Sequence, residues 1–212
     1  MKRSYLEGIA TVVMMLCAVA AVGWLFSRPT SAEPQTIKSD WEQEVVQQGM
    51  LVAGKLPAPL VIVEFVDFEC PFCGTFAEQV DTLKTEFPEV AVVMHHFPVP
   101  QHKYAAPAAI VSECADRQGR GGEIYTALFD AQEEFGMKPW HDYAVVAGVP
   151  DLDTFDQCIL LPQDSFPRIR YGQGLGEKNM VRGTPEVWAN KKWWGGYTSM
   201  ETLRQRIREE LK

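Results

Sequence analysis

The feature that most constrains this chain is an apolar run that ends close to a pair of cysteines. Residues 60–66 are rich in β-branched side chains, which predicts a buried strand. The tetrapeptide Cys70-Pro71-Phe72-Cys73 follows, and apolar residues then recur at helical spacing. Proline is favoured at the first position of a helix, so Cys70 is expected at the N-cap.

This placement predicts a redox-active dithiol. Cys70 and Cys73 lie one turn apart on the expected helix and can bridge each other. Cys70 also faces unpaired backbone N–H groups and the positive end of the helix dipole, which favours its thiolate. A plain disulfide or half of a zinc site are the alternatives. Because Cys114 and Cys158 stand singly and no histidine pair has ligand spacing, neither a metal nor another cofactor is expected.

The N-terminal part of the chain contains a charge-free apolar run, residues 8–26. The run exceeds the roughly 7–15 residues of a signal-peptide core and reaches the roughly 17–25 residues of a membrane-spanning helix. Residues 1–27 are therefore predicted to be a membrane anchor, with cleavage near Ala32 as the alternative, and residues 28–40 to be a linker. The remaining domain, residues 41–212, is expected outside the cytoplasm, where disulfides can form.

The rest of the pattern predicts an α/β domain, because strands and helices alternate around a mainly helical region. The expected order is β-β-α-β, a helical insert over about residues 100–180, and then β-β-α. The last helix opens with a predicted capping box, Thr198 and Glu201. The formal net charge of -8 argues against nucleic acid as a main partner.

Four motifs in this order resemble the DsbA-like thiol:disulfide oxidoreductases of the thioredoxin superfamily. They are the segment from Glu64 to Cys73, His96-Phe97-Pro98 with His102, the Ala-rich segment ending Glu113-Cys114-Ala115, and Val181-Arg182-Gly183-Thr184-Pro185. The resemblance covers almost all of the chain beyond residue 60. It implies a thioredoxin fold with a helical insertion.

The resemblance also implies a role for each matching residue of the site. Cys70 would be an exposed nucleophile that forms mixed disulfides, and Cys73 would be the resolving thiol. Glu64 would be a buried acid below the pair, with a raised pKa, and would exchange a proton with Cys73. Thr184 and Pro185 would form a cis-proline loop whose backbone pairs with an extended substrate.

Phe72 departs from the family's best-known motif. It is expected to contact substrate, but a phenyl ring cannot hydrogen-bond to the thiolate or carry a positive charge as a histidine can. The pKa of Cys70 is therefore expected to be less depressed than the value of about 3.5 known for DsbA, and the protein to be a weaker oxidant.

Three further interpretations concern residues outside the dithiol. Cys114 and Cys158 are expected to form a structural disulfide across the insert, with two separate buried thiols as the alternative. The histidines are interpreted as packing or loop-fixing residues, with a place at the rim of the active site as the alternative. Trp193 and Trp194 are expected to alternate, one in the core and one on the surface.

Taken with the resemblance, the sequence predicts a single-pass membrane protein that forms disulfides in exported polypeptides. The resemblance implies that a quinone-linked membrane partner reoxidises the dithiol. A tethered reductase or isomerase is the alternative, and a non-enzymatic thioredoxin-like chaperone is a third interpretation.

Overall fold

A computed structural model describes Met14 and residues 37–212. The chain divides after Gln35, and the second unit, Thr36–Lys212, holds the fold described below. The predicted anchor, Met14 apart, and most of the linker lie outside the described residues. In the part of the chain that the structure describes, no helix is both long and apolar enough to cross a membrane.

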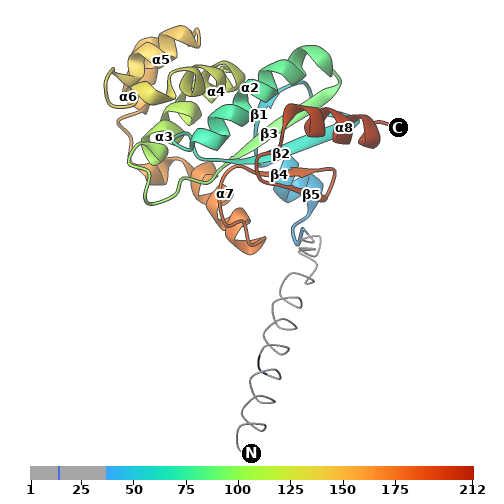
Figure 1. The fold of residues 1–212 in the computed structure, drawn as a ribbon. Helices are drawn as coiled ribbons and strands as arrows, with labels where there is room; N and C mark the ends of the chain where they lie inside the picture. The colour runs from blue at the N-terminus through green and yellow to red at the C-terminus, as the bar shows by residue number, and fades with distance from the viewer. Residues whose placement is uncertain (1–13, 15–36) are drawn as a thin grey trace, which may run out of the picture. The chain divides into compact units, whose positions relative to one another are not determined.

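The second unit is a five-stranded sheet with helices on both faces (Figure 1). The strands are β1 (Met50–Ala53), β2 (Leu60–Val66), β3 (Val90–His96), β4 (Glu186–Ala189) and β5 (Lys192–Gly195). The helices are α2 (Pro71–Glu86), α3 (Ala105–Asp116), α4 (Gly121–Asp130), α5 (Trp140–Val146), α6 (Leu152–Cys158), α7 (Pro167–Lys178) and α8 (Met200–Glu210). Short turns of other helix types are η1 (Trp41–Val46), η2 (Gln132–Glu134) and η3 (Gln163–Ser165).

The sheet has the strand order β1-β3-β2-β4-β5, and this order places β2 at its centre. Strands β2 and β3 are parallel, joined through α2, and every other neighbouring pair is antiparallel. The sequence of elements is the predicted β-β-α-β, helices, β-β-α. Glu64 therefore has Met94 of β3 on one side and Val187 of β4 on the other.

Strand β2 is buried on both faces because alternate residues enter two different cores. Ile62 and its same-face neighbours pack with α2, α4 and α8, whereas Val63 and its neighbours pack with η1 and α7. Both faces are also covered at β5. Trp194 packs against the first core and Trp193 against the second, so the prediction that one tryptophan faces solvent is wrong.

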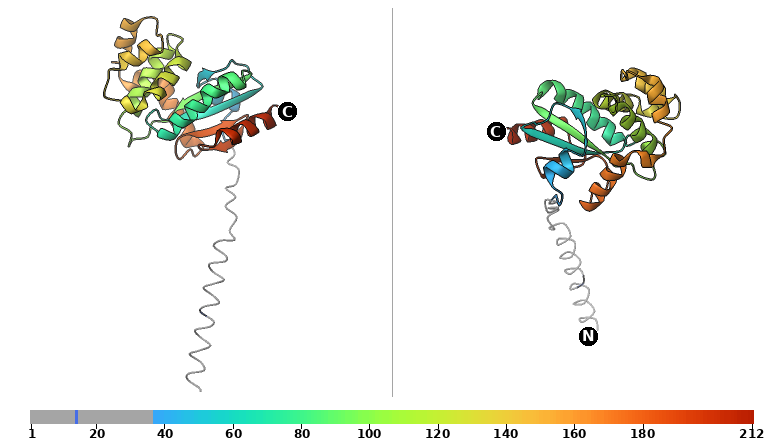
Figure 2. Two further views of the ribbon diagram at one scale, coloured as in Figure 1. Left: turned by 45° about the horizontal axis from the view of Figure 1, so that its top comes forward. Right: turned by 180° about the vertical axis from the view of Figure 1, so that it is seen from behind.

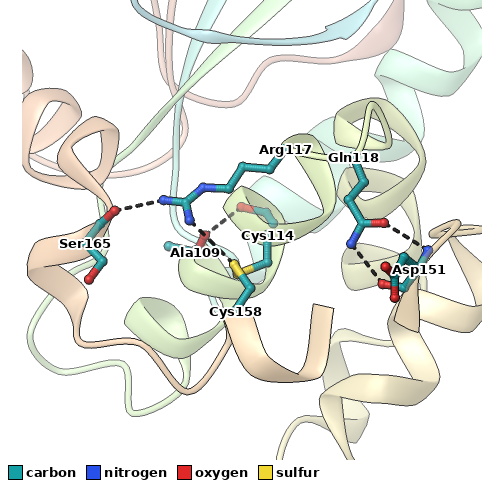
Figure 3. The surroundings of a disulfide bond; sticks show 8 residues. Ala109, Cys114, Arg117, Gln118, Asp151, Cys158 and Ser165 are labelled. Carbon is teal, nitrogen blue, oxygen red and sulfur yellow. Dashed lines mark hydrogen bonds between the residues drawn. A yellow bond between two sulfur atoms is a disulfide. The ribbon is translucent and has the colours of Figure 1, made fainter. Parts of the chain in front are cut away.

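Within the insert, α3 to α6 gather at the opposite end of the sheet from α8, whereas α7 packs against β3 in the second core (Figures 1 and 2). A disulfide joins Cys114 at the end of α3 to Cys158 at the end of α6 (Figure 3). Arg117 donates a hydrogen bond of 2.8 Å to the carbonyl oxygen of Ser165. These contacts hold the end of α3 against the later part of the insert.

Helix α8 begins one residue later than predicted. Its N-cap is Ser199, whose side chain accepts a hydrogen bond from the backbone N–H of Thr202 at 3.3 Å. The predicted cap, Thr198, lies in the preceding loop, where its carbonyl oxygen accepts a 2.8 Å hydrogen bond from Gln79 of α2. This contact ties the loop to α2, and the helix starts after the next residue with a capping side chain.

Candidate active site

The cysteine pair begins helix α2, directly beyond the end of β2. Cys70 is the N-cap and Pro71 occupies the first turn, as the sequence predicts. Asp67 shapes the intervening loop, since its carbonyl oxygen accepts from the N–H of Cys70 at 3.0 Å. Its carboxylate accepts from the N–H of Glu69 at 2.8 Å. Asp67 was not among the predicted site residues.

The histidines at the end of β3 and in the loop that follows it all have structural partners. His102 lies 2.9 Å from the Asp67 carboxylate, which ties the loop after β3 to the cysteine loop. His96 lies 2.8 Å from Glu113 of α3, and His95 lies 2.6 Å from the carbonyl oxygen of Val45. These contacts agree with the packing and loop-fixing interpretation.

The two thiols are free and differ in their access to solvent. Cys73 is fully buried, and only 6% of Cys70 is exposed. The expectation of an exposed Cys70 is therefore wrong. The loop before β4 covers the sulfur, because the Sγ of Cys70 lies 3.2 Å from the carbonyl oxygen of Thr184, which accepts from the S–H group of the protonated thiol. The Thr184–Pro185 peptide bond is cis.

The two thiols also differ in acidity. A hydrogen bond from Cys73 is the largest cause that lowers the pKa of Cys70, to about 5, and the backbone N–H groups of Phe72 and Cys73 add to it. Burial raises the pKa of Cys73 well above its usual range. Near neutral pH the reduced site therefore holds a thiolate at Cys70 and a thiol at Cys73.

Glu64 is fully buried in the central strand, on the face that carries α2. Burial raises the pKa of Glu64 to about 8, while the hydrogen bond from Tyr125 and the neighbouring Cys73 thiol act in the opposite direction. The hydroxyl of Tyr125, in α4, donates to Oε2 of Glu64 at 2.7 Å. Sequence reasoning missed Tyr125, because its helical spacing indicated only a core position.

The surface around the dithiol differs on its two sides. Phe72 is 60% exposed and Tyr197 46% exposed, and their ring centroids lie 6.1 Å apart. On the insert side, Gln132 donates to the carbonyl oxygens of Phe68 and Cys70 at 2.6 and 3.0 Å. Within residues 37–212, no group of three or more His, Cys, Asp and Glu side chains is arranged to bind a metal ion.

The chain matches the family described as thioredoxin over residues 46–209. Among curated proteins, the chain is 36% identical over 173 residues to a Na⁺/H⁺ antiporter NhaA 1 of Mycolicibacterium vanbaalenii, covering 79% of this chain and 28% of the relative. It is 35% identical over 177 residues to a protein of the same name from Mycolicibacterium gilvum, covering 81% and 28%. The chain therefore spans less than a third of the length of these relatives.

Solved structures of similar fold include BdbD from Bacillus subtilis, with a TM-score of 0.69, 18% identity, and coverage of 84% of this chain and 98% of that one. The thiol-disulfide exchange protein α-DsbA2 from Wolbachia pipientis has a TM-score of 0.70 at 18% identity, covering 80% and 91%. Because the family match extends over most of the sequence, the chain belongs to the thioredoxin family, and its fold is that of the DsbA-like thiol–disulfide oxidoreductases.

Proposed function

We propose that this protein is a thiol:disulfide oxidoreductase that forms disulfide bonds in cysteine-containing polypeptides outside the cytoplasm. One observation carries the proposal: Cys70 is the N-cap of α2, Cys73 is fully buried one turn into that helix, and the loop of Thr184 lies over the Cys70 sulfur at 3.2 Å. In this setting the pKa of Cys70 is lowered to about 5, while burial raises the pKa of Cys73. A strongly acidic nucleophile beside a buried partner suits stepwise disulfide exchange.

The proposed reaction starts from the Cys70–Cys73 disulfide. A substrate thiolate attacks the sulfur of Cys70, the S–S bond breaks, and Cys73 leaves with the electron pair and takes up a proton. A second substrate thiolate then attacks the substrate sulfur of the mixed disulfide, and Cys70 leaves as a thiolate. The substrate gains a disulfide and the enzyme gains two electrons, which a membrane partner, of the quinone-linked kind, would remove.

The acidity of Cys70 favours this direction over reduction of substrates. A thiol of lower pKa leaves faster, and it also stabilises the reduced form of the enzyme, which makes the oxidised form a stronger oxidant. The pKa of about 5 lies above the value of about 3.5 known for DsbA. We therefore place this protein among moderate oxidants.

Substrate contacts in this proposal come from both sides of Cys70. Thr184, in the loop before Pro185, is partly exposed and offers its backbone to an extended peptide. Phe72, in the first turn of the helix that Cys70 caps, forms an exposed aromatic pair with Tyr197. This pair suits apolar side chains that flank a substrate cysteine.

The proposed location is the outer face of a membrane, with residues 1–27 as the tether. The charge-free run at residues 8–26 supports a tether. The Cys114–Cys158 disulfide supports an oxidising compartment. The curated relatives are named as Na⁺/H⁺ antiporters, and such transport takes place across a membrane, which supports the tether but not a particular face.

Equilibration of the purified protein with glutathione buffers tests the direction of the reaction. We expect a reduction potential between about -120 and -200 mV, in the range of oxidising and isomerising dithiols. A potential near the value of about -270 mV found for thioredoxin would overturn the proposed disulfide donation. As a control on the role of each cysteine, both variants are offered a substrate that already contains a disulfide. In Cys73→Ser the Cys70 thiolate should attack that disulfide, release one substrate thiolate and accumulate as the mixed disulfide, whereas Cys70→Ser should form none.

A further inference from the structure

The two carboxylate oxygens of Glu64 have different surroundings. Oε2 accepts a 2.7 Å hydrogen bond from the hydroxyl of Tyr125. Oε1 is buried and has no hydrogen-bond partner among the residues that the structure describes. Glu64 and Tyr125 are both fully buried, so each polar group depends on its protein neighbours.

The fold of the insert places Tyr125 at this carboxylate. Helix α4 runs close against β1, since a Cβ added at Gly122 would lie 2.7 Å from the carbonyl oxygen of Val52. Tyr125 follows Gly122 by one helical turn and so lies on the same face. Its ring packs with Phe68, at a centroid distance of 6.2 Å, and with Phe129, at 5.0 Å. Aromatic packing therefore fixes the ring that carries the hydroxyl.

We propose that Tyr125 is a positioning residue for disulfide exchange: its hydroxyl holds Oε2 of Glu64 and leaves Oε1 to exchange the proton of Cys73. The inference rests on the proposed function, because it assigns a part of the same site. It gives the helical insert, through Tyr125, a role in the proton exchange between Glu64 and Cys73.

The proton balance is simple in both directions. When a substrate thiolate breaks the Cys70–Cys73 disulfide, the departing thiolate of Cys73 takes the proton from Oε1, and Glu64 becomes a carboxylate. A proton from solvent later restores the acid. In the reverse direction, the Cys73 thiol gives its proton to Oε1. In either case the hydroxyl of Tyr125 stabilises the charged form of a carboxylate that is out of contact with water.

The charged and titratable groups that act on this pair come from α2 and its N-cap residue. Cys70 and Cys73 of α2 face Glu64, and Cys70 as a thiolate disfavours the carboxylate while the Cys73 thiol favours it. Asp81 of α2 acts on Tyr125, whose pKa is raised well above its usual range, first by burial and then by Glu64. The hydroxyl therefore stays protonated and remains a donor at working pH.

Tyr125→Phe removes the hydroxyl and keeps the packed ring. In the full-length reduced protein, the titration of Glu64 is followed by carbon NMR of labelled glutamate. Its midpoint should move upward by about one to two pH units, because the variant lacks a hydrogen bond to the charged carboxylate. The pH profile of dithiol oxidation should move with it. The ultraviolet thiolate absorbance of Cys70 should still inflect near its original pH. An unmoved Glu64 inflection would overturn the proposal.

Tyr143→Phe is the matched control, since Tyr143 is also buried and its hydroxyl donates at 3.1 Å to the carbonyl oxygen of Ala131. An equal shift in both variants would overturn a specific role for Tyr125. In a Glu64→Gln background, Tyr125→Phe should leave the pH profile unchanged, and a further shift would also contradict the proposal. If the wild-type protein exchanges no disulfides, the proposed function is wrong. The NMR comparison of wild type with Tyr125→Phe still tests the hydrogen bond between Tyr125 and Glu64.

If Tyr125→Phe does not fold, the proposal is tested by infrared spectroscopy of the wild-type protein. The infrared C=O band of protonated Glu64, identified by its loss in Glu64→Gln, should lie at the lower frequency of a hydrogen-bonded carbonyl. A band at the frequency of a free acid would overturn the assignment.

Discussion

At the scale of single residues, the acidity of Cys70 depends on what its neighbours donate. Cys73 and the backbone of the first turn of α2 supply hydrogen bonds, but Phe72 supplies none from its side chain. That ring is 60% exposed and stacks loosely on Tyr197. In the proposed function this position contributes surface for substrate, and its side chain brings no positive charge to the thiolate.

Phe72→His should lower the pKa of Cys70, because an imidazolium beside the thiolate favours its charged form. We expect the inflection of thiolate absorbance to fall from about 5 in wild type. A shift of about one unit corresponds to roughly 1.4 kcal/mol, and it should make the protein more oxidising. Phe72→Leu is the control and should keep the wild-type inflection. If both variants titrate alike, charge at this position does not set the acidity of Cys70.

Local patterns predicted the residues that lie near one another in sequence. Cys70 at the N-cap follows from Pro71, and the burial of Glu64 follows from the apolar strand around it. Tyr125 lies 61 positions from its partner Glu64, and Gln132 lies 62 positions from its partner Cys70. No local sequence pattern could therefore place either residue at the site. The one available signal is the hydroxyl of Tyr125 within an apolar helix face, since a buried tyrosine usually has a hydrogen-bond partner.

At the scale of elements, the disulfide and its neighbouring hydrogen bonds hold the insert together. Cys114 and Cys158 lie 44 positions apart, and Gln118 makes two hydrogen bonds of 2.9 Å with the backbone of Asp151 nearby (Figure 3). Closing so long a loop restricts the unfolded chain strongly.

Replacing both Cys114 and Cys158 by serine should lower the free energy of unfolding by about 2–4 kcal/mol. Urea titration of the full chain under non-reducing conditions measures the change. The thiolate inflection of Cys70 serves as the control and should stay at its wild-type pH, because the disulfide touches neither redox cysteine. A variant as stable as wild type would contradict a structural role for this bond.

The boundaries of elements were predicted well where a run of apolar residues coincides with a buried strand, as in β2. The start of α8 was missed by one residue, because Thr198 and Ser199 can both cap a helix and their sequence alone does not decide between them. The two tryptophans of β5 were missed for a related reason. Alternation along a strand predicts two faces, but it does not tell whether both are covered.

At the scale of the whole molecule, the site combines three parts of the chain that are distant in sequence. The end of β2 and the start of α2 provide the thiols and Glu64. The insert provides Tyr125, and the loop before β4 provides Thr184. The proposed tether, residues 1–27, would keep this site at a membrane surface, within reach of both exported substrates and a membrane partner that removes electrons.

The redox state of Cys70 and Cys73 in living cells tests the proposed disulfide donation most directly. Intact cells carrying the full-length chain are quenched with acid, and free thiols are then alkylated with a reagent that adds mass. A parallel sample is labelled, after reduction, with a reagent that cannot cross membranes, which tests the proposed location outside the cytoplasm. We predict that the pair is mostly oxidised and that it is reached from outside. A pair held mostly reduced would contradict the proposed role as a donor of disulfides.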